Sequence, residues 1–390
     1  MMLTAQITTL KESPQHRNAL IKLIEENFPK GSPTEHAARV QDEFHLLLGQ
    51  HNEDRVLMLV DEHLPHGTLS THPIVACASY KIFDVKVKGS RKTLKCAGIG
   101  LVVTHKNYQR QGYGHRIQAE IEQRAQKEGA LLCILWSDLV SYYTGLGYLI
   151  AGTEMQWQLD VSDLNILKRR LEAEVHSPYV VEPLKNYEPV KNIFEESGFG
   201  PQRNFAEYEP LFELPNTYAF AAKNKPTQKI EGYAIMGKAR DMRDTIHEIV
   251  GSPACVGTLL KEMVKFCASG LRVQIPTQSP LNTELEHWLG KGTKSALAFF
   301  KVLQGPQLAE WIQSAGILPA GIGITSHVKG FTLLNRHIAF FESQDFGHLV
   351  QLFLGPWSVS ELEDLPSGLL AHLGSSAEPI ALYFFGFDSV

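Results

Sequence analysis

Residues 98–114 read GIGLVVTHKNYQRQGYG, and this stretch decides how the first part of the chain folds. The apolar run ending at Val103 is typical of a buried strand, and a polar turn follows it. Gly112 and Gly114 then open a helix predicted over 112–127. The first turn of a helix presents free N–H groups and a partial positive charge, so it suits a phosphate group. Because glycines let those N–H groups approach and Arg110 adds a cation, the turn is predicted to hold a diphosphate.

A Gly-x-Gly pattern alone is weak evidence, because the same glycines could simply cap a helix. Other phosphate-binding motifs fit this stretch less well. It has no Gly-Lys-Ser/Thr ending of a nucleotide P-loop, and no full Gly-x-Gly-x-x-Gly with an acidic residue placed for a ribose. His105, in the polar turn, is expected to be solvated rather than catalytic.

A second motif makes the interpretation specific. Gln109-x-x-Gly112-x-Gly114 resembles motif A of the GNAT superfamily, and residues 142–148, YYTGLGY, resemble its motif B. The resemblance implies a mixed α/β (α+β) GNAT fold that binds acetyl-coenzyme A, the co-substrate, with Tyr143 protonating the departing thiolate. It implies these cofactor-binding residues: Leu101, Val102, Val103, Gln109, Arg110, Gln111, Gly112, Tyr113, Gly114 and His115.

The rest of the chain resembles the Eis-type acetyltransferases, which carry GNAT domains in tandem and a C-terminal domain like sterol carrier protein. The residues that carry this resemblance are 136–138 (WSD), 246–250 (IHEIV), 271–273 (LRV), 300–303 (FKVL) and 349–355 (LVQLFLG). It implies a catalytic GNAT domain over 1–160, a degenerate copy over 176–303 and a small sterol-carrier-like α/β domain over 304–390. Residues 251–257 carry no Arg-Gly pattern, so the second copy is expected to bind no cofactor.

Direct attack on a thioester needs a neutral amine and hence a base or water that takes its proton. The strand over 96–103 contains no carboxylate and no histidine. The Eis resemblance implies that the terminal carboxylate of Val390 is this base, and the apolar tail 383–390 fits an anchored terminus. Asp138, Asp388 and water are the alternatives.

Composition narrows the choice of partner. The chain has 390 residues with 42 acidic and 37 basic side chains, a formal net charge of -5. This charge disfavours nucleic-acid and membrane-surface binding. The five cysteines show no close Cys-x-x-Cys pair, so buried free thiols are expected rather than disulfides or a metal site. No signal peptide or membrane span is recognised, and a cytoplasmic location is the default expectation.

The sequence therefore predicts an acetyl-coenzyme-A-dependent N-acetyltransferase that acts on a primary amine, a small molecule or a lysine side chain, in a ternary complex. The alternative is a non-catalytic acyl-coenzyme-A sensor. The Eis resemblance allows a homo-oligomer. Near the C-terminus, the patterns predict strands over 321–330, 331–341 and 347–355 and a helix over 358–373.

Overall fold

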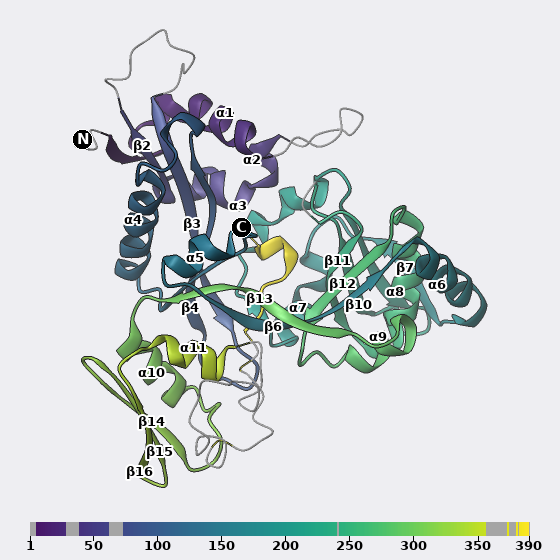
Figure 1. Ribbon diagram of the computed structural model, residues 1–390. Helices are drawn as coiled ribbons and strands as arrows, with labels where there is room; N and C mark the ends of the chain where they lie inside the picture. Colours follow the sequence, from purple (N-terminus) through teal and green to yellow (C-terminus); the bar gives the residue numbers. More distant parts are fainter. Residues whose placement is uncertain are drawn as a thin grey trace.

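The computed structural model describes residues 5–28, 39–61, 73–239, 242–355, 373, 380 and 382–389. These residues form two halves that share one large sheet, with a smaller unit attached to the first half (Figure 1). None of the helices within the described ranges has the length and apolar character needed to cross a membrane.

In the first half, helices cover both faces of the sheet. Its strands are β1 (Gln6–Thr9), β2 (Val56–Val60), β3 (Ile74–Lys86), β4 (Leu94–Thr104) and β5 (Leu132–Leu135). Its helices are α1 (Arg17–Asn27), α2 (Val40–Glu43), α3 (His45–Leu48), α4 (Tyr113–Lys127) and α5 (Val140–Gly145). Leu57 and Leu59 of β2 share a core with Ile117 of α4, whereas Met58 shares a core with Leu20 of α1. Burial on both faces explains why β2 reads as a continuous apolar run.

The second half repeats this order. Its strands are β7 (Tyr179–Pro183), β8 (Gly200–Pro201), β9 (Tyr218–Asn224), β10 (Ile230–Met236), β11 (Thr245–Gly251) and β12 (Leu271–Pro276). Its helices are α6 (Val161–Glu174), α7 (Lys191–Glu196), α8 (Val256–Met263) and α9 (Asn282–Leu289). In both halves an antiparallel hairpin is followed by a helix and then by a strand parallel to the hairpin's second strand. The predicted tandem arrangement is confirmed.

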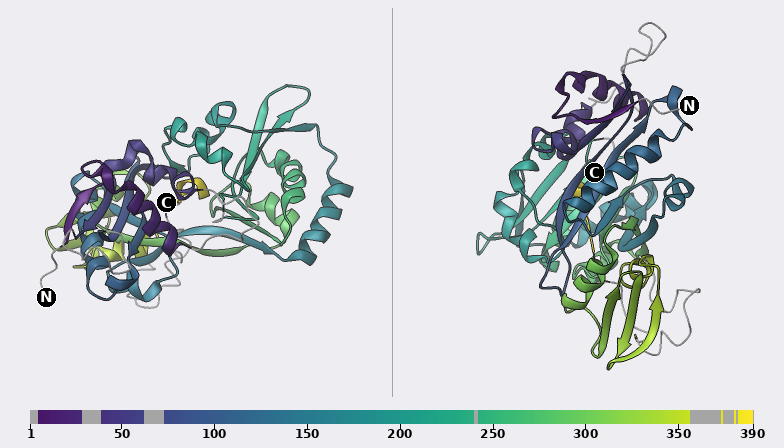
Figure 2. Two further views of the ribbon diagram at one scale, coloured as in Figure 1. Left: turned by 90° about the horizontal axis from the view of Figure 1, so that it is seen from above. Right: turned by 90° about the vertical axis from the view of Figure 1, so that its left-hand side faces the viewer.

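Two long strands join the halves into a 13-stranded sheet. β6 (Leu149–Leu159) pairs with β12 of the second half, and β13 (Thr293–Val302) lies between β5 and β6. Seen from above, the halves lie side by side with these strands crossing between them (Figure 2). β13 thus completes the sheet of the first half although it falls within the range expected for the second domain. The limits 1–160, 176–303 and 304–390 stay a prediction.

The third unit contains α10 (Gly305–Ser314), the three-stranded sheet of β14 (Ile322–His327), β15 (Gly330–Asn335) and β16 (Ile338–Ser343), and α11 (Gly347–Phe353). The strand predicted over 347–355 is wrong, because α11 occupies this range. Leu349, Val350 and Phe353 are all buried, a spacing that one helix face satisfies. The Gly347 N–H donates to Asp345 Oδ1 (2.7 Å) at the start of this helix. Apart from residue 373, the helix predicted over 358–373 lies outside the described residues.

Candidate functional site

The first half contains a gap between two parallel strands. β4 and β5 pair only from Cys96 to Gly98 on the β4 side, and then they separate. Opposite this point, the register between β3 and β4 shifts by a residue, and Leu101 adopts φ 55°. A leucine in the left-handed region carries about 1–3 kcal/mol of strain, which is characteristic of functional sites. The resulting bulge turns the backbone of residues 101–103 relative to the rest of β4.

The turn after β4 has the conformation that a phosphate cradle needs. Gly112 is the N-cap of α4 and has φ 84°, and Arg110 has φ 59°. A Cβ added to Gly114 would lie 2.9 Å from the Tyr142 hydroxyl, so only glycine fits there, whereas no atom lies within 4 Å of where a Cβ on Gly112 would stand. No acidic residue stands in the first turn of α4 to oppose an anion.

Gln109 and Gln111 both make hydrogen bonds within the turn. The Gln109 side-chain amide donates to the Thr104 carbonyl (3.3 Å), and the Gln111 amide donates to the Asn107 carbonyl (3.2 Å). His105 is buried, at 4% exposure, and its Nδ1 accepts from the Asn107 N–H (3.3 Å). The expectation of a solvated His105 is therefore wrong, because the ring caps the turn from inside.

A cavity of about 750 Å³ lies over the gap between the strands. Its lining residues are Asn27, Phe28, Val102, Val103, Thr104, Tyr108, Gln109, Arg110, Gly112, Tyr113, Gly114, His115, Leu139, Tyr142 and Tyr143. Most of the residues singled out in the sequence thus meet in one place, although Leu101 and Gln111 are not part of the lining. Asn27 and Phe28, at the end of α1, belong to no motif, and sequence reasoning missed them.

Tyr143 of α5 is nearly buried in the wall of this cavity, with 5% exposure. Its ring packs against Tyr142 (5.0 Å between centroids), Tyr148 (5.7 Å) and Phe299 of β13 (5.8 Å). Burial, followed by the influence of Tyr142, raises the pKa of Tyr143 to about 12. The phenol therefore keeps its proton at neutral pH.

The C-terminal tail lies between the two halves (Figure 1). The Phe384 ring contacts Phe83 of β3 (5.5 Å) and Trp136, just after β5 (5.7 Å). The Lys238 ammonium donates to the Gly386 carbonyl (3.3 Å) and to the backbone and side-chain oxygens of Ser389. The last described residues are therefore fixed against both halves, whereas Val390 lies outside the described residues.

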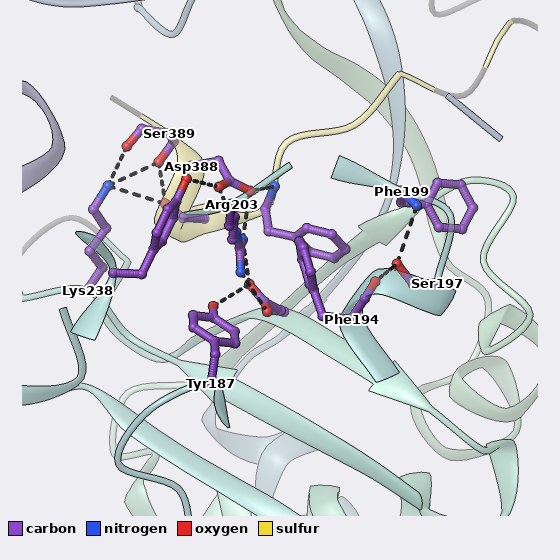
Figure 3. A network of polar contacts seen from close by, with 12 residues as sticks. Tyr187, Phe194, Ser197, Phe199, Arg203, Lys238, Asp388 and Ser389 are labelled. Carbon is purple, nitrogen blue, oxygen red and sulfur yellow. Dashed lines mark hydrogen bonds and ion pairs between the residues drawn. The ribbon is translucent and has the colours of Figure 1, made fainter. Parts of the chain in front are cut away.

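A buried ion network anchors this tail. Arg203 points toward Asp388 (Figure 3) and donates to both of its oxygens (2.9 and 2.7 Å). Arg203 also donates to both oxygens of Glu248 (3.1 and 2.9 Å), and the Tyr208 hydroxyl donates to Asp388 (2.8 Å). The side chains of Arg203, Glu248 and Asp388 are 0% exposed. Asp388 therefore has no exposed atom with which to deprotonate a substrate, which argues against it as the base.

Two other sequence-based expectations concern cysteines and metals. All five cysteines are buried and free, as expected. Within the part of the chain that the structure describes, no group of His, Cys, Asp or Glu side chains is arranged to hold a metal ion.

Comparisons with known proteins agree with this geometry. Residues 14–151 match the model of the acetyltransferase (GNAT) domain family. A search of curated protein sequences finds no match. Eis1 from Mycobacterium abscessus is a similar solved structure, with a TM-score of 0.62 and 13% identity over 97% of this chain and 99% of that one. A GCN5-related N-acetyltransferase from Kribbella flavida has a TM-score of 0.57 and 17% identity over 87% of this chain and 85% of that one.

The first half of the chain is therefore a GNAT acetyltransferase domain, which makes the protein an acyltransferase. Taken over its whole length, the chain has the tandem fold of an Eis-like GNAT protein. GNAT acetyltransferases use acyl-coenzyme A, and the open space at Gly112 and the basic turn at Arg110 fit a diphosphate.

Proposed function

We propose that this protein is an acetyl-coenzyme-A-dependent N-acetyltransferase, in which a primary amine attacks the thioester carbonyl directly within a ternary complex. The observation that supports this most is the cavity that brings the turn around Gly112 together with Tyr143. The turn suits a diphosphate, and the bulged backbone at Val102 and Val103 suits the pantetheine arm. A backbone N–H in that bulge would polarise the carbonyl.

Direct attack is favoured over a route through an acylated cysteine. Such a route needs a reactive thiolate that faces the cofactor. None of the cavity's lining residues is a cysteine. Burial also raises the pKa of the Cys77 thiol, the cysteine on β3 nearest the bulge, to about 12. The acyl group therefore passes straight to the amine.

Tyr143 is proposed to give its proton to the thiolate that leaves. Replacing Tyr143 with Phe removes the proton but keeps the ring that packs against Phe299. We expect kcat to fall by roughly 10²–10⁴ while coenzyme A binding stays within a factor of about three. Thiol release from acetyl-coenzyme A with a panel of amines measures kcat, and calorimetry measures the affinity for coenzyme A.

The matched control is Tyr142→Phe, because Tyr142 lines the same cavity on the same helix. An unchanged kcat in Tyr143→Phe would reject the role of general acid. Tight binding of the cofactor with no thiol release from the wild-type protein across the whole panel would support the sensor instead.

The terminal carboxylate of Val390 is the proposed base. Its support is the anchoring of the tail up to Ser389, the residue before Val390, by Arg203 and Lys238. Deleting Val390 alone is expected to lower kcat by at least about tenfold without changing the dissociation constant of coenzyme A. Asp138, which is exposed beside the cavity residue Leu139, provides the rival variant Asp138→Asn. A loss of turnover in Asp138→Asn but not in the truncated chain would transfer the role to Asp138.

The remaining predictions concern the setting of the enzyme. We propose that the acceptor is a small-molecule or lysine-type amine, that no metal, nucleic acid or membrane takes part, and that the protein acts in the cytoplasm. A homo-oligomer is consistent with the Eis resemblance, and sedimentation analysis of the purified chain tests it.

A further inference from the structure

The second half contains a cavity of about 500 Å³ at the place where the first half holds its own. β11 and β12 pair in parallel only at Thr245 and Ile246 on the β11 side, and then they separate. The cavity lies where they part, between the end of β11 at Val250 and the segment after β12 at Leu281. The repeated fold has therefore kept an open cleft in both copies.

The turn of the second half does not suit a diphosphate. Pro253 has no N–H to offer, and the Ser252 hydroxyl already accepts from the Ala254 N–H (3.3 Å). Gly257, in the first turn of α8, faces the Trp288 ring, which lies 2.9 Å from where its Cβ would be. This close contact matches that of Gly114 with Tyr142, so the two turns differ at Ser252 and Pro253, which stand where the first half has the open turn at Gly112.

The charges in the second cavity are negative. Its described lining contains the acidic residues Glu196 and Glu231 and no Lys, Arg or His. The Tyr179 hydroxyl (2.5 Å) and the Asn224 side-chain amide (2.9 Å) donate to the two oxygens of Glu231 and hold this carboxylate in position. An anionic ligand would be repelled, whereas a cation would find a fixed counter-charge.

Two lysines contact segments beside this cavity but lie outside its described lining. The Lys86 ammonium donates to the Glu195 carbonyl (2.9 Å), and the Lys88 ammonium donates to the Gln278 carbonyl (2.6 Å). Neither lysine belongs to the lining. Most of the remaining wall is apolar, formed by side chains such as Ile193, Ile249 and Phe385.

We propose that this second cavity binds an organic ammonium ion with an apolar body, and that it binds no coenzyme A. The apolar body would pack against Ile193 and Ile249, and the ammonium group would pair with Glu196 and Glu231. Because Phe385 forms part of the wall, the bound ligand would contact the tail that ends between the two halves.

Calorimetry on the full chain tests the proposal, with octyltrimethylammonium as the probe below its micelle concentration. This probe has no N–H and cannot be acetylated, so its binding does not depend on the proposed enzymatic activity. Saturating coenzyme A occupies the first cavity beforehand. We expect one probe per chain and at least about tenfold weaker binding of octyl sulfate, which has the same chain and the opposite charge.

Variants locate the site. Ile193→Trp narrows the cavity from α7, and we expect it to lower the affinity for the probe by at least about tenfold. Glu231→Gln removes the fixed charge, with a loss of similar size. Glu196→Gln is expected to weaken the probe several-fold. Its matched control is Glu195→Gln, which removes the neighbouring exposed carboxylate outside the lining. This variant should leave the affinity for the probe unchanged.

Several results would overturn the proposal. They are equal affinity for the ammonium and the sulfate, unchanged binding in Ile193→Trp, or two molecules of coenzyme A per chain. Circular dichroism shows whether Glu231→Gln is folded. If it is not, Ile193→Trp and the pair Glu196→Gln and Glu195→Gln still decide the question, since these positions are not fully buried.

Discussion

In the first half, β4 and β5 separate beside a turn that carries Arg110 and Gly112, whereas in the second half β11 and β12 separate beside a turn that carries Ser252 and Pro253. The strand order and the following helix are the same, and each half has a cavity in the gap. The backbone therefore supplies the space, and a few side chains at the turn determine which ligand fits it.

The helices that follow these turns are alike in one respect. A Cβ would lie 2.9 Å from the Tyr142 hydroxyl at Gly114 and 2.9 Å from the Trp288 ring at Gly257, so both glycines allow close packing. A glycine in a helix costs about 1 kcal/mol relative to alanine. The contrast lies in the turns themselves, because no atom lies within 4 Å of a Cβ position at Gly112, whereas Pro253 has no N–H to offer.

The largest expected effect concerns the tail that both halves hold. Arg203→Ala leaves Glu248 and Asp388 buried without their cation, and we expect a loss of about 3–5 kcal/mol in the free energy of unfolding. Urea denaturation measures it. Arg170→Ala, which breaks a partly exposed pair with Glu174, is the control and should cost about 1 kcal/mol or less. Equal effects of the two variants would show that the network does not anchor the tail.

The next-largest expected effect is on the affinity for coenzyme A, and it distinguishes the turn of the first half from that of the second. Gly114→Val would push against Tyr142 and Thr104, which both line the cavity proposed for coenzyme A. We expect coenzyme A to bind at least about 100-fold more weakly, or ~2.7 kcal/mol, by calorimetry. Ala254→Val creates the same side chain in the exposed turn of the second half and should leave the affinity for coenzyme A unchanged. If Gly114→Val bound normally while Ala254→Val did not, the assignment of the two cavities would be reversed.

Local patterns predicted the strand, the turn and the helix of the first site, whereas long-range contacts were missed. A strand, a glycine turn and a helix follow one another within residues 98–127, so short-range rules suffice there. The insertion of β13 between β5 and β6 joins segments far apart in the chain, and no pattern in either segment states the pairing. Phe299 and Phe385 reach their sites only through such long-range contacts.

The error over 347–355 has a different cause. The run LVQLFL is apolar at nearly every position, so its periodicity does not distinguish a strand from a short buried helix. Packing of α11 against β6 and β13 decides the outcome, and that contact is tertiary. His105 was misplaced for a similar reason, since a polar residue in a turn does not reveal that the turn folds over it.

The smallest predicted effect is on the pH dependence of stability, and it concerns β6, one of the strands that join the two halves. Glu154 of β6 stands opposite Pro276 of β12 and Ser295 of β13, and only 6% of it is exposed. Burial raises its pKa from 4.5 to about 7, against the opposing hydrogen bonds from Gln156 and Ser295. The folded protein therefore holds this proton more tightly than the unfolded chain does. The stabilisation from the protonated group is complete below pH 4.5 and is lost as the pH rises through about 7.

Glu154→Gln stays neutral at every pH and should not suffer this loss. Relative to the wild type, the variant is expected to gain about 1–2 kcal/mol in unfolding free energy between pH 5 and pH 8. At 1.36 kcal/mol per pKa unit, the full pKa shift of Glu154 would give a larger gain. The expected gain is smaller because the amide keeps only part of the hydrogen bonds around Glu154. Thermal denaturation of both proteins at the two pH values measures the difference, and the values at pH 5 serve as the internal reference. A gain that is the same at both pH values would mean that packing at the seam, rather than the buried charge, limits how firmly the two halves are joined.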